Sequence, residues 1–186
     1  MEAVIKKEIE KEIEGSIENA VEGIGENQIS NMQKHKNYRD NFTKLKRALE
    51  LEFYYEAIFI EYSIIEDRTE SILRHADKWE AYLKKHRRGN PLREPTIESK
   101  IKYINGQLES GNKLLIKYFS TDILTQILEW KEDRNKLIHA LLNQSLTDED
   151  LAQIAFRGDA LTKDLRNRAT AYSRAIQRQR KKESEK

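Results

Sequence analysis

The amino-acid sequence predicts an all-α protein: a bundle of four or five helices with an additional amphipathic helix at its N-terminus. Charged residues make up 35% of the 186 residues, with only two prolines and seven glycines, a composition that favours long helices over a β-rich fold. Apolar residues recur every three or four positions, and no segment alternates as a strand does. This length is enough for one full hydrophobic core.

The N-terminal part has a narrow apolar stripe. Within residues 3–22 an apolar side chain recurs at almost every fourth position (Val4, Ile5, Ile9, Ile13, Ile17 and Val21). Gly23 and Gly25 end this helix, and the polar stretch up to Asn37 predicts a linker. Because the stripe is narrow, we expect the helix to pack on the main domain, on a second subunit or on a partner. The expected parts of the chain are residues 1–37 (helix and linker), 38–182 (helical domain) and 183–186 (disordered tail).

The helical domain begins with a long segment free of glycine and proline. From Arg39 to Lys85 the pattern predicts one very long helix, or two helices with a bend near residues 75–77. Thr96 is a candidate N-cap for a helix that ends near Glu109. The remaining helices are expected over residues 122–143 and from Thr147 into the basic C-terminus.

Several classes of chemistry are excluded by missing residues and motifs. The chain has no cysteine, which rules out a disulfide, a thiolate metal site and a cysteine nucleophile. It also lacks a glycine-rich phosphate loop, a His-Glu-x-x-His metal motif and a Gly-x-Ser-x-Gly elbow, so we expect no metal and no cofactor. The first residues are too charged for a signal peptide, and no apolar run approaches ~18 residues. We therefore expect a soluble cytoplasmic protein without a membrane partner.

Charge is distributed unevenly along the chain. The net charge of +2 does not by itself indicate nucleic-acid binding. However, residues 157–186 carry ten Lys or Arg against four acids, and a second basic cluster contains Lys84, Arg87 and Arg88. Such clusters are usually solvated surface, but beside a phosphate-binding cleft they would contact RNA. We take Lys84, Arg87 and Arg88 as candidate RNA-binding residues on that condition.

One arginine lies on the wrong face of its helix. Winding residues 122–143 at ~100° per residue places Arg134 within an apolar stripe that includes Trp130 and Leu137. Asn135 and His139 share a second inward edge. A guanidinium is always charged and is rarely buried without a partner, which makes Arg134 a candidate site residue. The alternatives are that Arg134 reaches solvent or pairs with a carboxylate of another helix, and that His139 packs in a helix seam.

Arginine, histidine and a polar neighbour suit phosphoryl transfer. A guanidinium binds a phosphodiester with two parallel hydrogen bonds, and histidine moves the proton of an attacking or leaving oxygen. RNA supplies its own nucleophile, the 2′-hydroxyl. These residue types therefore point to RNA as a substrate that needs no activated side-chain nucleophile.

The segment from Arg134 and Asn135 to His139 resembles the R-x4–6-H motif of the HEPN superfamily, including the polar residue after the arginine. The resemblance implies an up-and-down helical bundle over residues 38–182. It also implies a metal-independent endoribonuclease that acts as a homodimer, with two motif copies lining one cleft, and leaves 2′,3′-cyclic phosphate ends. Many such proteins act in toxin–antitoxin, abortive-infection or CRISPR defence, so a protein antitoxin is among the implied partners. Other members only bind RNA, nucleotides or proteins.

A second pair, Arg68 and His75, also fits the motif spacing, with Glu61 one heptad before Arg68. A buried Glu61–Arg68 ion pair is one interpretation; the other is that Glu61, Arg68 and His75 support the same cleft. We favour Arg134 and His139 because a polar residue follows the arginine and no acid shares its stripe. The neighbouring acids Glu132 and Asp133 are expected to face water.

The spacing of Arg134 and His139 predicts a dimer. Five residues correspond to ~140° around a helix, so one helix cannot easily aim both side chains at a single phosphate. A symmetric dimer would bring the second copy's residues across the interface. The leading hypothesis is a homodimeric ribonuclease. The alternatives are a non-catalytic module that binds RNA, a nucleotide or a protein, and a helical protein that assembles through its N-terminal helix.

Overall fold

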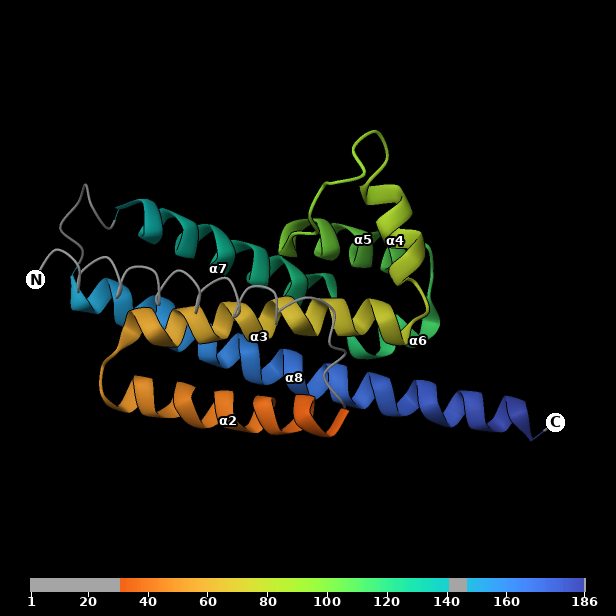
Figure 1. Ribbon diagram of the computed structural model, residues 1–186, viewed down its shortest axis with the longest axis horizontal. Helices are drawn as coiled ribbons and strands as arrows, with labels where there is room; N and C mark the ends of the chain where they lie inside the picture. Colours follow the sequence, from red (N-terminus) through yellow and green to blue (C-terminus); the bar gives the residue numbers. More distant parts are fainter. Residues whose placement is uncertain (1–30, 141–146, 186) are drawn as a thin grey trace, which may run out of the picture. The chain divides into compact units, whose positions relative to one another are not determined.

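The computed structural model describes residues 31–140 and 147–185. In this part of the chain all regular secondary structure is helical and there is no strand, which confirms the all-α class. It comprises seven helices: α2 (Asn31–Glu50), α3 (Tyr54–His75), α4 (Trp79–His86), α5 (Ile97–Glu109), α6 (Lys113–Tyr118), α7 (Thr121–Ala140) and α8 (Asp148–Ser184) (Figure 1). The helix predicted over residues 3–22 lies outside the described residues. The chain divides into two units between Arg39 and Asp40, and the account below concerns the second unit.

The long segment expected from Arg39 to Lys85 is three helices. The chain turns between α2 and α3, where Glu52 has a φ of 60° and the Phe53 N–H donates to the Ala48 carbonyl at 2.8 Å. No glycine or proline marks this turn, so the sequence pattern did not reveal it. The bend expected at residues 75–77 is confirmed, because α3 ends at His75. In contrast, the linker predicted up to Asn37 is wrong from Asn31 onward, where α2 begins. Its earlier part lies outside the described residues.

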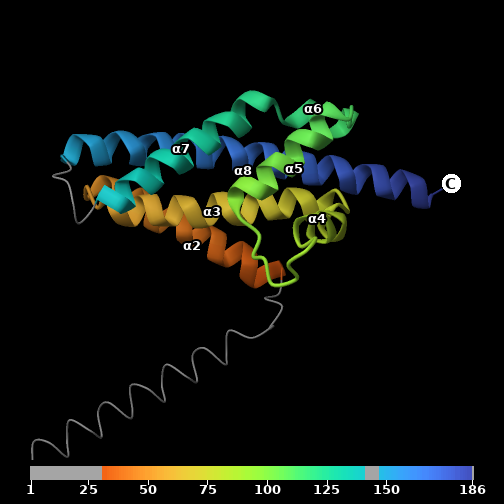
Figure 2. The same ribbon diagram turned by 90° about the horizontal axis from the view of Figure 1, so that it is seen from above.

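Helices α3 and α8 form the centre of the unit. They lie side by side along much of their lengths, and α7 packs on α8 while α5 packs on both α3 and α7 (Figures 1 and 2). The largest fully buried side chain is that of Trp130 on α7, whose indole N–H donates to the Ile154 carbonyl of α8 at 3.0 Å. The apolar stripes of these helices meet in one core. This packing fixes the orientation of α7, and with it which of its side chains are buried.

Two threonines begin helices as predicted. Thr96 accepts a hydrogen bond from the Ser99 N–H at 3.2 Å and caps α5. Thr147 accepts one from the Asp150 N–H at 3.2 Å, and the Asp150 carboxylate accepts from the Thr147 N–H in return. This reciprocal arrangement satisfies backbone groups that the first turn of α8 leaves without helical partners. Across the two described stretches, no helix has both the length and the apolar character needed to cross a bilayer.

Candidate functional site

Arg134 lies at the edge of the buried stripe of α7, half-buried, while Trp130 and Leu137 on either side of it are fully buried. Its guanidinium carbon sits 4.4 Å from the ring centre of Tyr62 on α3. Nη1 donates to the side-chain oxygen of Asn135 at 3.2 Å, and the buried Nε has no hydrogen-bond partner among the described residues. The guanidinium is therefore held over an aromatic ring, an arrangement that suits the planar group of arginine better than the ammonium of lysine.

Arg134 forms no ion pair with a carboxylate of residues 31–140 or 147–185. The nearby acids have other partners: Asp133 pairs with Arg157 of α8 at 2.7 Å, and Glu98 pairs with Lys131 at 3.2 Å. Asp133 was expected to face water, but it is half-buried because α8 supplies this arginine. The interpretation of Arg134 as half of an ion pair thus finds no support in the described part of the chain.

His139 is exposed, five residues beyond Arg134 on the same helix. Near its C-terminal end α7 buries Leu137 and Ala140, so the inward edge expected for His139 faces solvent instead. The neighbouring Ile138 is 39% exposed. Within one chain, Arg134 contacts Asn135 and Tyr62, and the structure does not bring His139 to the same side of the helix.

Glu61 is fully buried, and neither of its carboxylate oxygens has a hydrogen-bond partner among the described residues. No ion pair joins it to Arg68, because the Glu61 side chain is directed at Gly158 of α8 instead. Burial raises the pKa of Glu61 to about 9; Asp159 acts in the same direction and Lys163 opposes it. At neutral pH Glu61 is therefore a neutral carboxylic acid in the core.

Arg68 and His75 are half-buried further along α3. The Nδ1 of His75 lies 2.7 Å from the Ser71 carbonyl, and because a carbonyl only accepts, Nδ1 carries the proton. The carbonyl of His75 accepts from Arg180 of α8 at 3.1 Å. These contacts tie the end of α3 to α8 and do not involve Arg134.

The candidate RNA-binding residues lie near the C-terminal end of α3, whereas Arg134 lies over the earlier residue Tyr62. Lys84 and Arg88 are exposed on α4 and the turn after it, and the half-buried Arg87 donates to the Arg93 carbonyl at 3.4 Å. From Tyr62 to the end of α3 is about 20 Å, at 1.5 Å per residue. The basic C-terminal part of α8 approaches the same end, where Arg180 pairs with Asp77 (Figure 1). The structure thus brings the two basic regions to one end, at a distance from Arg134.

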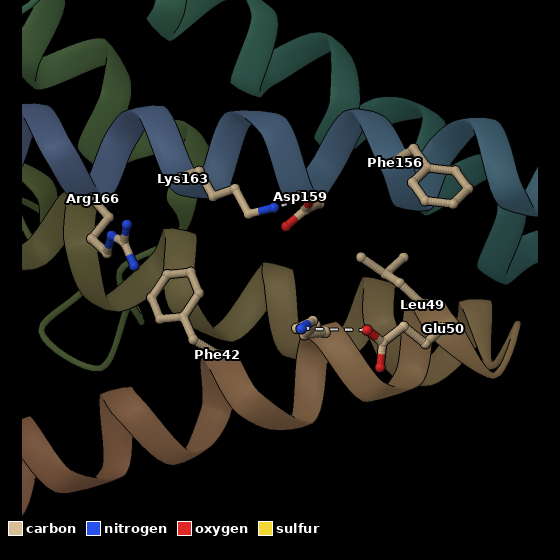
Figure 3. A pocket seen from close by; sticks show the side chains of 8 residues that line it. Phe42, Leu49, Glu50, Phe156, Asp159, Lys163 and Arg166 are labelled. Carbon is tan, nitrogen blue, oxygen red and sulfur yellow. Dashed lines mark hydrogen bonds and ion pairs between the residues drawn. The ribbon is translucent and has the colours of Figure 1, made fainter.

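A groove of about 500 Å³ lies between α2 and α8, and none of the predicted site residues lines it (Figure 3). The Arg166 guanidinium lies 4.5 Å from the Phe42 ring centre, and Lys163 and Lys46 pair within their own helices, with Asp159 and Glu50. In the part of the chain that is described, no three histidine, aspartate or glutamate side chains group as metal ligands would.

Sequence reasoning missed Tyr62, the ring beneath Arg134. The available signal was the spacing of Tyr55, Phe59 and Tyr62, which places three aromatic residues on one face of α3. It also missed the contact between Glu61 and Gly158, which joins residues almost a hundred positions apart. No sequence pattern relates such distant positions in a single chain.

The comparisons with known proteins return no relative: no family model, no curated protein and no solved structure matches the chain.

Proposed function

We propose that this chain is a metal-independent endoribonuclease of the HEPN type, with Arg134 as the phosphate-binding residue. The observation that carries the proposal is the environment of the Arg134 guanidinium. It is half-buried, oriented by Tyr62 and Asn135, and has no carboxylate partner among the described residues. A phosphodiester would supply the missing negative charge through paired N–H···O bonds.

Each residue has a distinct role in the reaction. The 2′-oxygen of the RNA attacks the neighbouring phosphorus, the bond from phosphorus to the 5′-oxygen breaks, and a 2′,3′-cyclic phosphate and a 5′-hydroxyl result. Arg134 stabilises the charge that develops on the phosphate oxygens. His139 takes the proton of the 2′-hydroxyl or gives one to the leaving 5′-oxygen. Asn135 keeps the guanidinium in place by accepting from Nη1.

The direction of His139 is the reason for including a second copy. On one α7 helix the two residues diverge by ~140°, so Arg134 of one copy and His139 of the other would share a phosphate. The exposed Ile138 beside His139 offers an apolar surface for such an interface. Mixing inactive Arg134→Ala and His139→Ala proteins tests this arrangement, because a mixed dimer regains one complete composite site. Activity in the mixture supports sharing between copies; a mixture as inactive as its components, in which mixed dimers do form, contradicts it.

The central experiment is RNA cleavage by the purified full chain in excess EDTA. Wild-type protein should cut total RNA or transfer RNA and leave cyclic phosphate ends, whereas Arg134→Ala and His139→Ala should not. Two matched controls carry the same chemical changes elsewhere. Arg166→Ala removes another guanidinium that stacks on a ring, and His35→Ala removes an exposed histidine of α2. Both controls should cut like wild type; equal activity in all five proteins would sink the proposal.

As a defence toxin, the protein should slow growth when it is expressed alone, and a protein antitoxin would relieve the effect by covering Arg134. Expression of the His139→Ala variant at the same level should leave growth normal. Normal growth with abundant wild-type protein would argue against a toxin.

A non-catalytic module that binds RNA or a nucleotide is the second candidate function. The observation that favours it is the exposure of His139 away from Arg134, so that His139 does not reach the phosphate that Arg134 of the same chain would hold. This candidate predicts binding that requires Arg134, is unaffected by His139→Ala and is accompanied by no cleavage.

A further inference from the structure

Two exposed aromatic side chains lie on the same face of α3 as Tyr62, the ring beneath Arg134. On α3, Phe59 is 64% exposed and Tyr55 is 40% exposed. They lie one and two turns before Tyr62, at spacings of three and four residues that place all three rings on one face of the helix. Large apolar side chains that gather on a surface usually mark a place where something binds.

Starting from Tyr62, which lies beneath Arg134, the rings of Phe59 and Tyr55 follow one another along α3. At 1.5 Å per residue, Phe59 lies about 4.5 Å and Tyr55 about 10 Å along α3 from Tyr62. These steps are somewhat longer than the ~3.4 Å between stacked nucleotides of one strand. A strand with one phosphate on Arg134 and its neighbours slightly spread would therefore meet the rings in succession.

We propose that Phe59 and Tyr55 stack on unpaired bases next to the phosphate held by Arg134, so that the substrate is single-stranded RNA. The inference rests on the proposed function, because it needs Arg134 to hold a phosphate. Aromatic side chains stack on bases that are free of a duplex, whereas the bases of a double helix are already stacked on each other. The rings therefore select against paired RNA.

Charge around these rings is compatible with an anionic strand. Glu66 shares their face of α3, but the buried Lys100 of α5 lies 3.5 Å from its carboxylate. Arg134 supplies positive charge on the facing helix α7, where Lys131 is already paired with Glu98 and Glu132. Burial and Glu66 raise the pKa of Tyr62, whereas Arg134 and Lys131 lower it, so Arg134 lies close enough to act on this ring. Aromatic rings beside cations are the combination that tracks a single strand.

The test is binding of a fluorescein-labelled, unstructured 2′-O-methyl RNA, followed by fluorescence anisotropy. This probe lacks the attacking hydroxyl and cannot be cut, so binding is measured apart from catalysis. Phe59→Ala should weaken binding by about 5- to 150-fold, which corresponds to loss of one base–aromatic stack. Phe59→Trp should retain binding. Phe156→Ala is the matched control, because Phe156 is 53% exposed on α8 and lines the separate α2–α8 groove. A 2′-O-methyl hairpin should bind more weakly, with no dependence on Phe59.

Unchanged affinity in Phe59→Ala would overturn the inference, as would equal affinity for hairpin and single strand. A Phe59→Ala protein that binds RNA normally but loses its dimeric state would show that the rings are a subunit interface, which also overturns it. The two proposals fail in different ways. Ring-dependent binding without cleavage of ordinary RNA removes the ribonuclease and leaves the stacking surface, whereas cleavage that ignores Phe59 removes only the stacking surface.

Discussion

The carboxyl group of Glu61 on α3 occupies the space that a side chain at Gly158 on α8 would need. A Cβ atom at Gly158 would overlap Oε2 of Glu61 and lie 2.7 Å from the indole nitrogen of Trp130. The glycine lets α3 and α8 converge around a buried acid that directly precedes Tyr62. It also leaves room for Trp130, which lies one turn before Arg134 on α7. The helix packing that positions the candidate site thus depends on the fit between the buried Glu61 carboxyl group and Gly158.

Gly158→Ala is expected to destabilise the protein, although alanine normally stabilises a helix by about 1 kcal/mol over glycine. The added methyl group has to displace a fully buried carboxyl group, and overpacking of this kind costs about 1–3 kcal/mol. Urea denaturation followed by circular dichroism measures the change in the free energy of unfolding.

Gly106→Ala on α5 is the matched control, because no atom lies within 4 Å of the position its Cβ would take. It should stabilise the protein by about 0.5–1 kcal/mol. Combining Gly158→Ala with Glu61→Ala should recover part of the loss by making room. A Gly158→Ala protein as stable as the Gly106→Ala protein would refute the packing argument.

The stability of the protein should fall as the pH rises, because of Glu61. Burial raises the pKa of this carboxyl from an ordinary 4.5 to about 9 in the folded state, so the folded state keeps a proton that the unfolded chain releases. The stabilising contribution is complete below about pH 4.5 and is lost progressively up to about pH 9. The slope is at most about 1.4 kcal/mol per pH unit. Urea denaturation at several pH values measures it.

Glu61→Gln separates this effect from every other titrating group, since the amide has nearly the same shape and does not ionise. The variant should match wild type near pH 5, exceed its stability by a few kcal/mol at pH 8.5 and show a flatter pH profile. Parallel profiles for the two proteins would mean that Glu61 is ionised in the fold.

The ring of Tyr62 should matter to cleavage through Arg134. Tyr62→Phe keeps an aromatic face under the guanidinium and should leave RNA cleavage near the wild-type rate. Tyr62→Leu removes the ring and should slow cleavage by about 2- to 30-fold, which corresponds to the ~0.5–2 kcal/mol of a cation–π contact. Single-turnover rates on one RNA measure both. An equal loss in the two variants would assign the role to the hydroxyl group.

The basic end of the unit lies about 20 Å along α3 from Tyr62, so it should contribute to affinity only for RNA long enough to reach it, and without selecting a sequence. Replacing the exposed Lys84 and Arg88 by glutamine should weaken RNA binding equally for different sequences. It should also reduce the slope of log affinity against log salt by up to about 1.4, at ~0.7 per phosphate contact in a single strand. The control replaces Lys46 and Lys102, which pair with acids of their own helices. The same reduction in that control would mean that general charge is responsible.

Local pattern predicted the helices well where their ends carry a specific residue. Thr96 and Thr147 each cap a helix as expected, because an N-cap is a contact within four residues of sequence. The turn at Glu52 was not predicted, since that residue adopts a positive φ with no glycine to signal it. The beginning of α2 was also missed, because its polar residues form a helix with little apolar pattern.

By itself, the sequence determined the all-α class, the helix that carries Arg134 and the position of that arginine beside a buried stripe. These properties follow from the period of a single helix. Only the tertiary structure decided which side chains Arg134 meets. Tyr62, the diversion of Asp133 to Arg157 and the burial of Glu61 under Gly158 all join different helices. Such contacts depend on the angles at which helices cross and on the side-chain volumes at the crossing. The apolar periodicity of a single helix carries no information about either.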